Sequence, residues 1–168
     1  MIYYKYNSFV FIELFNDYTG MLIRSNVLEH GIETKQLPMM HSFPELIDIG
    51  IMGACNAGKS GLCRNAGVDC YQRGMLSHET NMSLYDYCSI IAQCRGRTVQ
   101  IALGGAVDPN RHESLAEILR ATRENRIVPN YTTSGYNLTD REIELTKTYC
   151  GAVAVSFYSN IDKNGDED

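Results

Sequence analysis

The chain has 168 residues, of which 44% are hydrophobic and 21% are charged, and its formal net charge is −5. This length predicts one domain with a substantial core, and an acidic chain without a basic stripe argues against nucleic acid as a partner. No stretch approaches the roughly 20 apolar residues of a membrane span, and the short apolar run at residues 9–12 ends at Glu13, unlike a signal peptide.

The first 45 residues are expected to form a β-hairpin extension. Residues 8–15 and 21–27 are strand-like, and the glycine-containing loop at residues 16–20 has a length typical of hairpins. We interpret this extension as a structural cap or edge rather than a binding element. At the other end of the chain, residues 161–168 are predicted to form a disordered acidic tail.

From residue 46 onward, short apolar strands alternate with amphipathic helices. This alternation indicates βαβ units and a parallel sheet of about four strands. Within the first helix, Cys88 and Cys94 share a helical stripe with Leu84 and Ile91, so we expect both to be core thiols. The predicted strands are 46–52, 98–103, 127–133 and 152–158, and the predicted helical segments are 81–94, 113–124 and 139–150. Ser83 and Thr139 are the predicted capping residues of the first and third of these segments.

Unusual residues cluster at the carboxyl ends of these strands, where parallel sheets hold their sites. The first strand runs into a cysteine-rich loop, and the other three run into Gly104-Gly105, Ser134-Gly135 and residues 156–158. The sequence therefore predicts a functional site at this edge of the sheet.

The loop after the first strand carries three thiols, Cys55, Cys63 and Cys70, within sixteen residues, with glycines at positions 58, 61 and 67 between them. Glycine allows tight turns, so such a loop can bring its thiols to one point. Six cysteines in a chain with no recognisable export signal favour reduced thiols or metal ligands over disulfides, and hence a cytosolic location. An iron–sulfur cluster and zinc are the main candidates.

Two alternatives for this loop stay open. Residues 53–60 match the phosphate-binding pattern G-x-x-x-x-G-K-[ST], but that motif needs a helix beginning at Lys59, and the glycines at 61 and 67 interrupt the segment. Asp108 is a weak candidate for the accompanying magnesium ligand. A zinc module would need a fourth ligand, for which His78 or Cys88 could serve, and closer cysteine pairs than this loop has.

Beyond these alternatives, the segment from about residue 44 to residue 160 resembles the first half of a radical S-adenosylmethionine (radical SAM) enzyme. The matching stretches, in the family's order, are IDIGIMGACNAGKSGLC, GVDCYQRG, QIALGGAVDP, NRIVPNYTTSG and KTYCGAVAVSFY. The resemblance implies a partial (β/α) barrel over residues 46–160. It also implies that Cys55, Cys63 and Cys70 ligate three irons of a 4Fe–4S cluster, whose fourth iron binds S-adenosylmethionine.

The resemblance further implies contacts to S-adenosylmethionine. Gly104 and Gly105 would receive its amino group, and Ser134 and Ser156 would touch its carboxylate or ribose. Tyr71, beside the last cysteine of the loop, would pack near the adenine.

The chain departs from the family in three respects. The spacing between its cysteines is longer, and Ala106 stands where the family usually has a glutamate, whose role we assign as a hypothesis to Asp108. It has about four strands, whereas a closed eight-stranded barrel takes about 250 residues. We therefore expect a truncated product that is either inactive or completed by another chain.

If the product is active, the resemblance implies that it catalyses the family's reaction. It would take an electron from a flavodoxin- or ferredoxin-type donor and cleave S-adenosylmethionine reductively. The resulting 5′-deoxyadenosyl radical would act on a substrate that the sequence does not identify.

Overall fold

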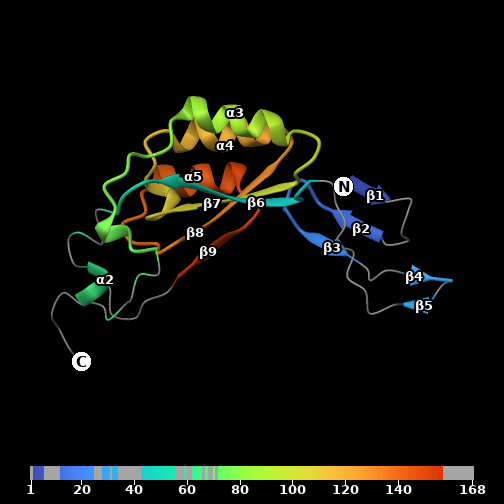
Figure 1. Ribbon diagram of the computed structural model, residues 1–168, viewed down its shortest axis with the longest axis horizontal. Coiled ribbons are helices and arrows are strands. Elements are labelled where there is room, and N and C mark those ends of the chain that lie inside the picture. Colours follow the sequence, from blue (N-terminus) through green and yellow to red (C-terminus); the bar gives the residue numbers. More distant parts are fainter. Residues whose placement is uncertain are drawn as a thin grey trace.

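The structure is a computed structural model that describes residues 2–5, 12–24, 28–30, 32–33, 43–55, 59, 62–65, 67, 70 and 72–156. At its centre is an open parallel sheet whose four strands follow sequence order, which confirms the predicted α/β fold. Three helices lie together on one side of this sheet (Figure 1). The strands are β6 (Leu46–Met52), β7 (Gln100–Gly105), β8 (Val128–Thr133) and β9 (Val153–Val155), and the helices are α3 (Leu84–Cys94), α4 (Leu115–Glu124) and α5 (Asp140–Tyr149).

Alternation along the strands decides which side chains face the helices. Ile49 of β6 lies opposite Leu103 of β7, which in turn lies opposite Tyr131 of β8, and all three are buried. This row is expected because every second residue of a strand points to the same face. The helices complete the core with Tyr87, Ile91 and Cys94 from α3 and Leu115, Ile118 and Leu119 from α4. Among the described helices, none has the length and apolar character needed to cross a lipid bilayer.

Helix α3 confirms one expected core thiol and corrects the other. Cys94 is buried as predicted, but Cys88 is exposed, and Tyr87 takes the core position instead. Spacings of four and three residues from Tyr87 to Ile91 and Cys94 form one buried stripe, and Cys88 lies a further 100° around the helix. Ser83 caps the helix as predicted, because its Oγ accepts a hydrogen bond from the Asp86 amide at 3.1 Å.

Helix α5 begins with the predicted capping box. Thr139 Oγ1 accepts from the Glu142 amide at 3.2 Å, and Glu142 Oε2 accepts from the Thr139 amide at 2.7 Å. Gly151 follows the helix as expected, but the structure gives a different reason for the glycine. A Cβ there would lie 2.8 Å from the Thr19 carbonyl oxygen and still closer to Val128, so the position requires glycine because of packing.

The N-terminal segment contains the predicted hairpin in a shorter form. Strands β2 (Ile12–Phe15) and β3 (Leu22–Arg24) pair antiparallel, while residues 8–11 and 25–27 of the predicted strands lie outside the described residues. The sequence did not predict β1 (Ile2–Lys5), which pairs with β2, or the short pair β4 (Leu28–Glu29) and β5 (Ile32–Glu33). The predicted acidic tail at 161–168 also lies outside the described part of the chain.

This hairpin packs against the amino ends of the parallel strands. Phe15, which is 1% exposed, forms a small apolar cluster with Val99 and Val128. Gln100 Nε2 donates to the Gly20 carbonyl at 2.8 Å, which ties the hairpin turn to the start of β7. In Figure 1 the hairpin and the short helix α2 (Leu62–Asn65) lie at opposite ends of the sheet, so the carboxyl ends remain clear of the hairpin.

Candidate functional site

A cleft of about 850 Å³ lies at the carboxyl ends of the parallel strands. Its walls come from the segments that follow β6, β7 and β8, as expected for a site in a parallel α/β sheet. The lining residues are Met52, Ala54, Glu79, Thr80, Asn81, Val107, Asp108, Arg111, Glu113, Ser134, Tyr136 and Asn137.

The two glycines at the end of β7 have different structural roles. Gly105 has φ +127°, and a Cβ there would lie 2.5 Å from the carbonyl oxygen and 2.6 Å from the amide nitrogen of Met52. It is glycine because β6 and β7 approach closely at this point, where the Ala106 amide also donates to the Met52 carbonyl at 2.8 Å. A Cβ at Gly104 would meet no atom within 4 Å, so packing does not require glycine there.

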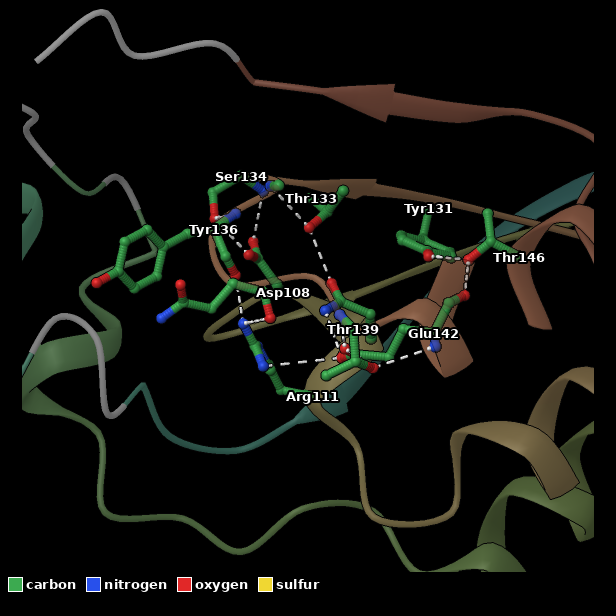
Figure 2. Close-up of polar contacts among 12 residues, drawn as sticks. Asp108, Arg111, Tyr131, Thr133, Ser134, Tyr136, Thr139, Glu142 and Thr146 are labelled. Atoms are coloured by element: carbon green, nitrogen blue, oxygen red, sulfur yellow. Dashed lines mark hydrogen bonds and ion pairs between the residues drawn. The ribbon is translucent and has the colours of Figure 1, made fainter. Parts of the chain in front are cut away.

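Asp108 and Ser134 join the ends of β7 and β8 (Figure 2). The Ser134 amide donates to Asp108 Oδ1 at 3.0 Å, and the Ser134 hydroxyl donates to Oδ2 at 2.5 Å. Both residues line the cleft. Ser134 was predicted as a site residue, and the structure shows that its partner is Asp108, which the sequence suggested only weakly.

A second set of polar contacts holds the loop after β8 in place (Figure 2). Arg111 donates to the carbonyl groups of Tyr136 and Asn137, the latter at 2.9 Å, and lies 3.8 Å from the Glu142 carboxylate. The Tyr136 ring points away from these contacts. Sequence reasoning missed Arg111 and Tyr136, although both follow a strand end, which is the signal that could have identified them.

The Glu142 carboxylate lies within this set of contacts and accepts from Asn110 Nδ2 at 2.9 Å. Asn110 Oδ1 in turn accepts from Thr133 Oγ1 at 2.8 Å, at the end of β8. Burial raises the pKa of Glu142, but hydrogen bonds from Thr139 and Asn110 outweigh this effect, so the pKa lies below its usual value. Glu142 is therefore ionised at neutral pH, and from helix α5 it contacts Asn110 and Arg111, the latter in the wall of the cleft.

The three predicted metal ligands lie in the segment between β6 and α3. Cys55 is buried, and its amide donates to the Gly74 carbonyl at 3.2 Å. Cys63 and Cys70 are half-buried. Cys63 lies in the four-residue helix α2, which the sequence did not predict, and the Cys70 carbonyl accepts from the Arg73 amide at 3.1 Å. None of the six cysteines forms a disulfide.

The pKa of Cys63 is shifted by burial, by the other two thiols of the loop and by one residue of the cleft wall. Burial raises the pKa of Cys63, and the negative charges of Cys55 and Cys70 raise it further. Asp108, in the wall of the cleft, acts on Cys63 in the same direction. Within the described residues, however, no three His, Cys, Asp or Glu side chains stand in an arrangement that could hold a metal ion.

The remaining predicted site residues have separate locations. Ser156 follows β9, and its amide donates to the Thr133 carbonyl at 2.8 Å, beside the end of β8. Tyr71 lies outside the described residues. The structure thus places Ser134, Gly104, Gly105 and Ser156 at neighbouring strand ends.

No protein-family model and no curated protein matches this sequence. Among solved structures, SuiB from Streptococcus suis bound to S-adenosylmethionine is 18% identical with a TM-score of 0.50, over 69% of this chain and 24% of SuiB. BtrN in complex with AdoMet and 2-DOIA is 20% identical with a TM-score of 0.53, over 71% of this chain and 48% of BtrN. What they share is the fold. The chain spans about a quarter of SuiB and about half of BtrN.

Proposed function

We propose that this chain is the S-adenosylmethionine-binding part of a radical SAM-type protein, with a 4Fe–4S cluster on Cys55, Cys63 and Cys70. The observation that carries the proposal is the cleft at the carboxyl ends of the parallel strands, whose lining includes Ala54, next to Cys55, together with the hydrogen-bonded pair Asp108 and Ser134. Two structures with the same fold hold S-adenosylmethionine, in agreement with the sequence resemblance.

The donor set suits such a cluster. Iron–sulfur clusters are held by cysteine thiolates, and three ligands from one loop would leave one iron for the amino and carboxylate groups of S-adenosylmethionine. The thiols must draw together on binding, and Gly67, which lies between Cys63 and Cys70, adopts φ +70°, a conformation that only glycine takes without strain. A bound cluster supplies the electron for reductive cleavage of S-adenosylmethionine.

The residues of the cleft would bind and orient the cofactor. The Asp108 carboxylate accepts two hydrogen bonds from Ser134 and has lone pairs left for an ammonium group. Gly104 leaves room for a ligand to approach the end of β7. Tyr136, on a loop held by Arg111, offers an aromatic surface. Tyr71 and Ser156 remain proposed contacts to the adenine and to the carboxylate or ribose.

No observation favours the two alternatives. A phosphate loop relies on the amide groups of a helix N-terminus, and the helix described in this loop, α2, has only four residues. A zinc module needs a fourth ligand, but both candidates, His78 and Cys88, are exposed.

Anaerobic reconstitution with iron and sulfide tests the proposal. We expect a brown protein with about four irons per chain, in which S-adenosylmethionine changes the electron paramagnetic resonance spectrum of the reduced cluster. Formation of 5′-deoxyadenosine after chemical reduction would extend the proposal to catalysis, with a flavodoxin- or ferredoxin-type protein as donor. Colourless protein that retains zinc, or iron uptake unchanged in Cys63→Ala, would overturn it.

A further inference from the structure

Three residues between the cysteine loop and α3 hold the chain where it leaves β6. We call these residues, Ser77, Asn81 and Met82, the clamp. The Gly53 amide donates to Asn81 Oδ1 at 3.1 Å, and the Gly53 carbonyl accepts from the Ser77 hydroxyl. One residue further along, the Met82 amide donates to the Ile51 carbonyl at 2.9 Å. A Cβ on Gly53 would lie 2.6 Å from the Glu79 carbonyl oxygen, so the fit leaves no space. Both polar groups of the Gly53 peptide backbone are therefore held by side chains.

Asn81 also reaches the opposite wall of the cleft. Its Nδ2 donates to Glu113 Oε2 at 2.7 Å, and this hydrogen bond lowers the pKa of the Glu113 carboxyl. Next to Glu113, the Nδ1 of His112 accepts from the Ser114 amide at 3.0 Å, so Nε2 carries the hydrogen and donates to the Met82 carbonyl at 2.9 Å. Two adjacent hydrogen bonds thus join the start of α4 to the clamp.

The chemistry at this position requires an amide side chain. The Gly53 N–H can only donate, and the ionised Glu113 carboxylate can only accept, so the bridging residue must accept on one side and donate on the other. Asparagine does both, and the two partners fix its orientation. An ionised aspartate would keep the contact to Gly53 but would face Glu113 as a like charge.

Gly53, the residue that the clamp holds, lies two residues before the first thiol. Cys55 follows Gly53 and Ala54, and its amide is held by Gly74. A Cβ on Gly74 would lie 2.9 Å from the Cβ of Cys55 and closer still to the Ala106 carbonyl oxygen, so Cys55 is fitted tightly from this side too. The connection from the cleft wall to the Cys55 sulfur therefore runs through Asn81 and two residues of backbone.

We propose that Asn81 is a positioning residue, whose amide fixes the Cys55 sulfur relative to the cleft through Gly53 and Glu113. This inference rests on the proposed function, because Cys55 matters there as a cluster ligand. Asn81 itself lines the cleft without serving as a ligand to the cluster. Residues that orient metal ligands in this way typically change metal affinity by roughly 10- to 100-fold when they are replaced.

We test the inference by comparing Asn81→Asp with the double variant Asn81→Asp/Glu113→Gln. In the double variant residue 113 donates and residue 81 accepts, so the hydrogen bond between them is restored in the opposite direction. Gln93→Glu, on the exposed face of α3, is the matched control because it introduces the same charge change outside the cleft. Loss of iron from the reconstituted full chain to a chelator is the first measurement. We expect roughly 10- to 100-fold faster loss in Asn81→Asp, restoration in the double variant, and no change in the control.

The second measurement needs no cluster. The rate at which a thiol reagent modifies the buried Cys55 in the iron-free chain, followed by mass spectrometry, should rise in Asn81→Asp and fall again in the double variant. If the wild-type chain takes up no iron, the proposed function fails, whereas this rate still decides the role of Asn81. The inference is overturned if Asn81→Asp and Gln93→Glu give the same rates of iron loss and of Cys55 modification, or if the double variant does not restore the wild-type rates. If Asn81→Asp does not fold, Asn81→Ser serves, since serine is too short to bridge both partners.

Discussion

Replacing Gly105 with alanine should destabilise the fold by about 2–6 kcal/mol. The added Cβ would lie 2.5 Å and 2.6 Å from backbone atoms of Met52, which cannot move aside as a flexible side chain could. Overpacking of this kind costs about 1–3 kcal/mol. The backbone at φ +127° adds strain of about 1–3 kcal/mol for any residue with a Cβ. The sum is a large fraction of the 5–15 kcal/mol by which domains are typically stable.

Gly104→Ala is the matched control, because its Cβ would enter open space. We expect its free energy of unfolding to stay within about 1 kcal/mol of the wild-type value, while its affinity for S-adenosylmethionine falls if the cofactor approaches this strand end. Urea denaturation followed by circular dichroism measures both stabilities. Equal stability of Gly105→Ala and wild type, or equal losses in the two variants, would refute the reasoning from close strand approach.

Three further predictions concern other parts of the molecule. Asp108→Asn should weaken S-adenosylmethionine binding in equilibrium dialysis by roughly 10- to 100-fold, because a hydrogen bond to a charged group is worth about 1.5–3 kcal/mol; unchanged affinity would remove Asp108 from the binding site. Arg123→Met should lower the free energy of unfolding by about 1.5–3 kcal/mol, since Arg123 donates to backbone carbonyls at the end of α5 and in the hairpin turn, and an unchanged urea midpoint would contradict this. The lowered pKa of Glu142 means that its ionised form stabilises the folded state fully above its ordinary value of 4.5, and this contribution is lost as the pH falls through the lower folded pKa. The stability gap between wild type and Glu142→Gln should therefore shrink on acidification below about pH 4.5, and a gap that is constant with pH would argue against an ionised Glu142.

Local patterns were sufficient where one element supplies all the interactions. The limits of β6 follow from an apolar run that ends at Gly53, and the caps at Ser83 and Thr139 involve partners only three residues away. Such contacts form within a single turn of chain, so they can be read directly from the residue types. The order of strands and helices, and hence the parallel sheet, followed from the same kind of pattern.

Side-chain burial depended on more than local pattern. The spacing in α3 allowed Cys88 or Tyr87 to face the core, and the packing of α3 against α4 decided for Tyr87, whose hydroxyl meets Thr122 Oγ1 at 2.6 Å. Gly151 looked like a helix stop, but its neighbours Thr19 and Val128 are far away in sequence and could not be foreseen.

The amino-acid sequence by itself determined the βα alternation, the helix caps, and the gathering of glycines, serines and cysteines after successive strands. Each of these is a property of neighbouring residues. Only the tertiary structure decided that Asp108 pairs with Ser134, that Asn81 joins Gly53 to Glu113, and that Arg111 holds the loop after β8. These partners are 25 to 32 residues apart in the chain, and they meet because parallel strands bring their carboxyl ends to one edge of the sheet.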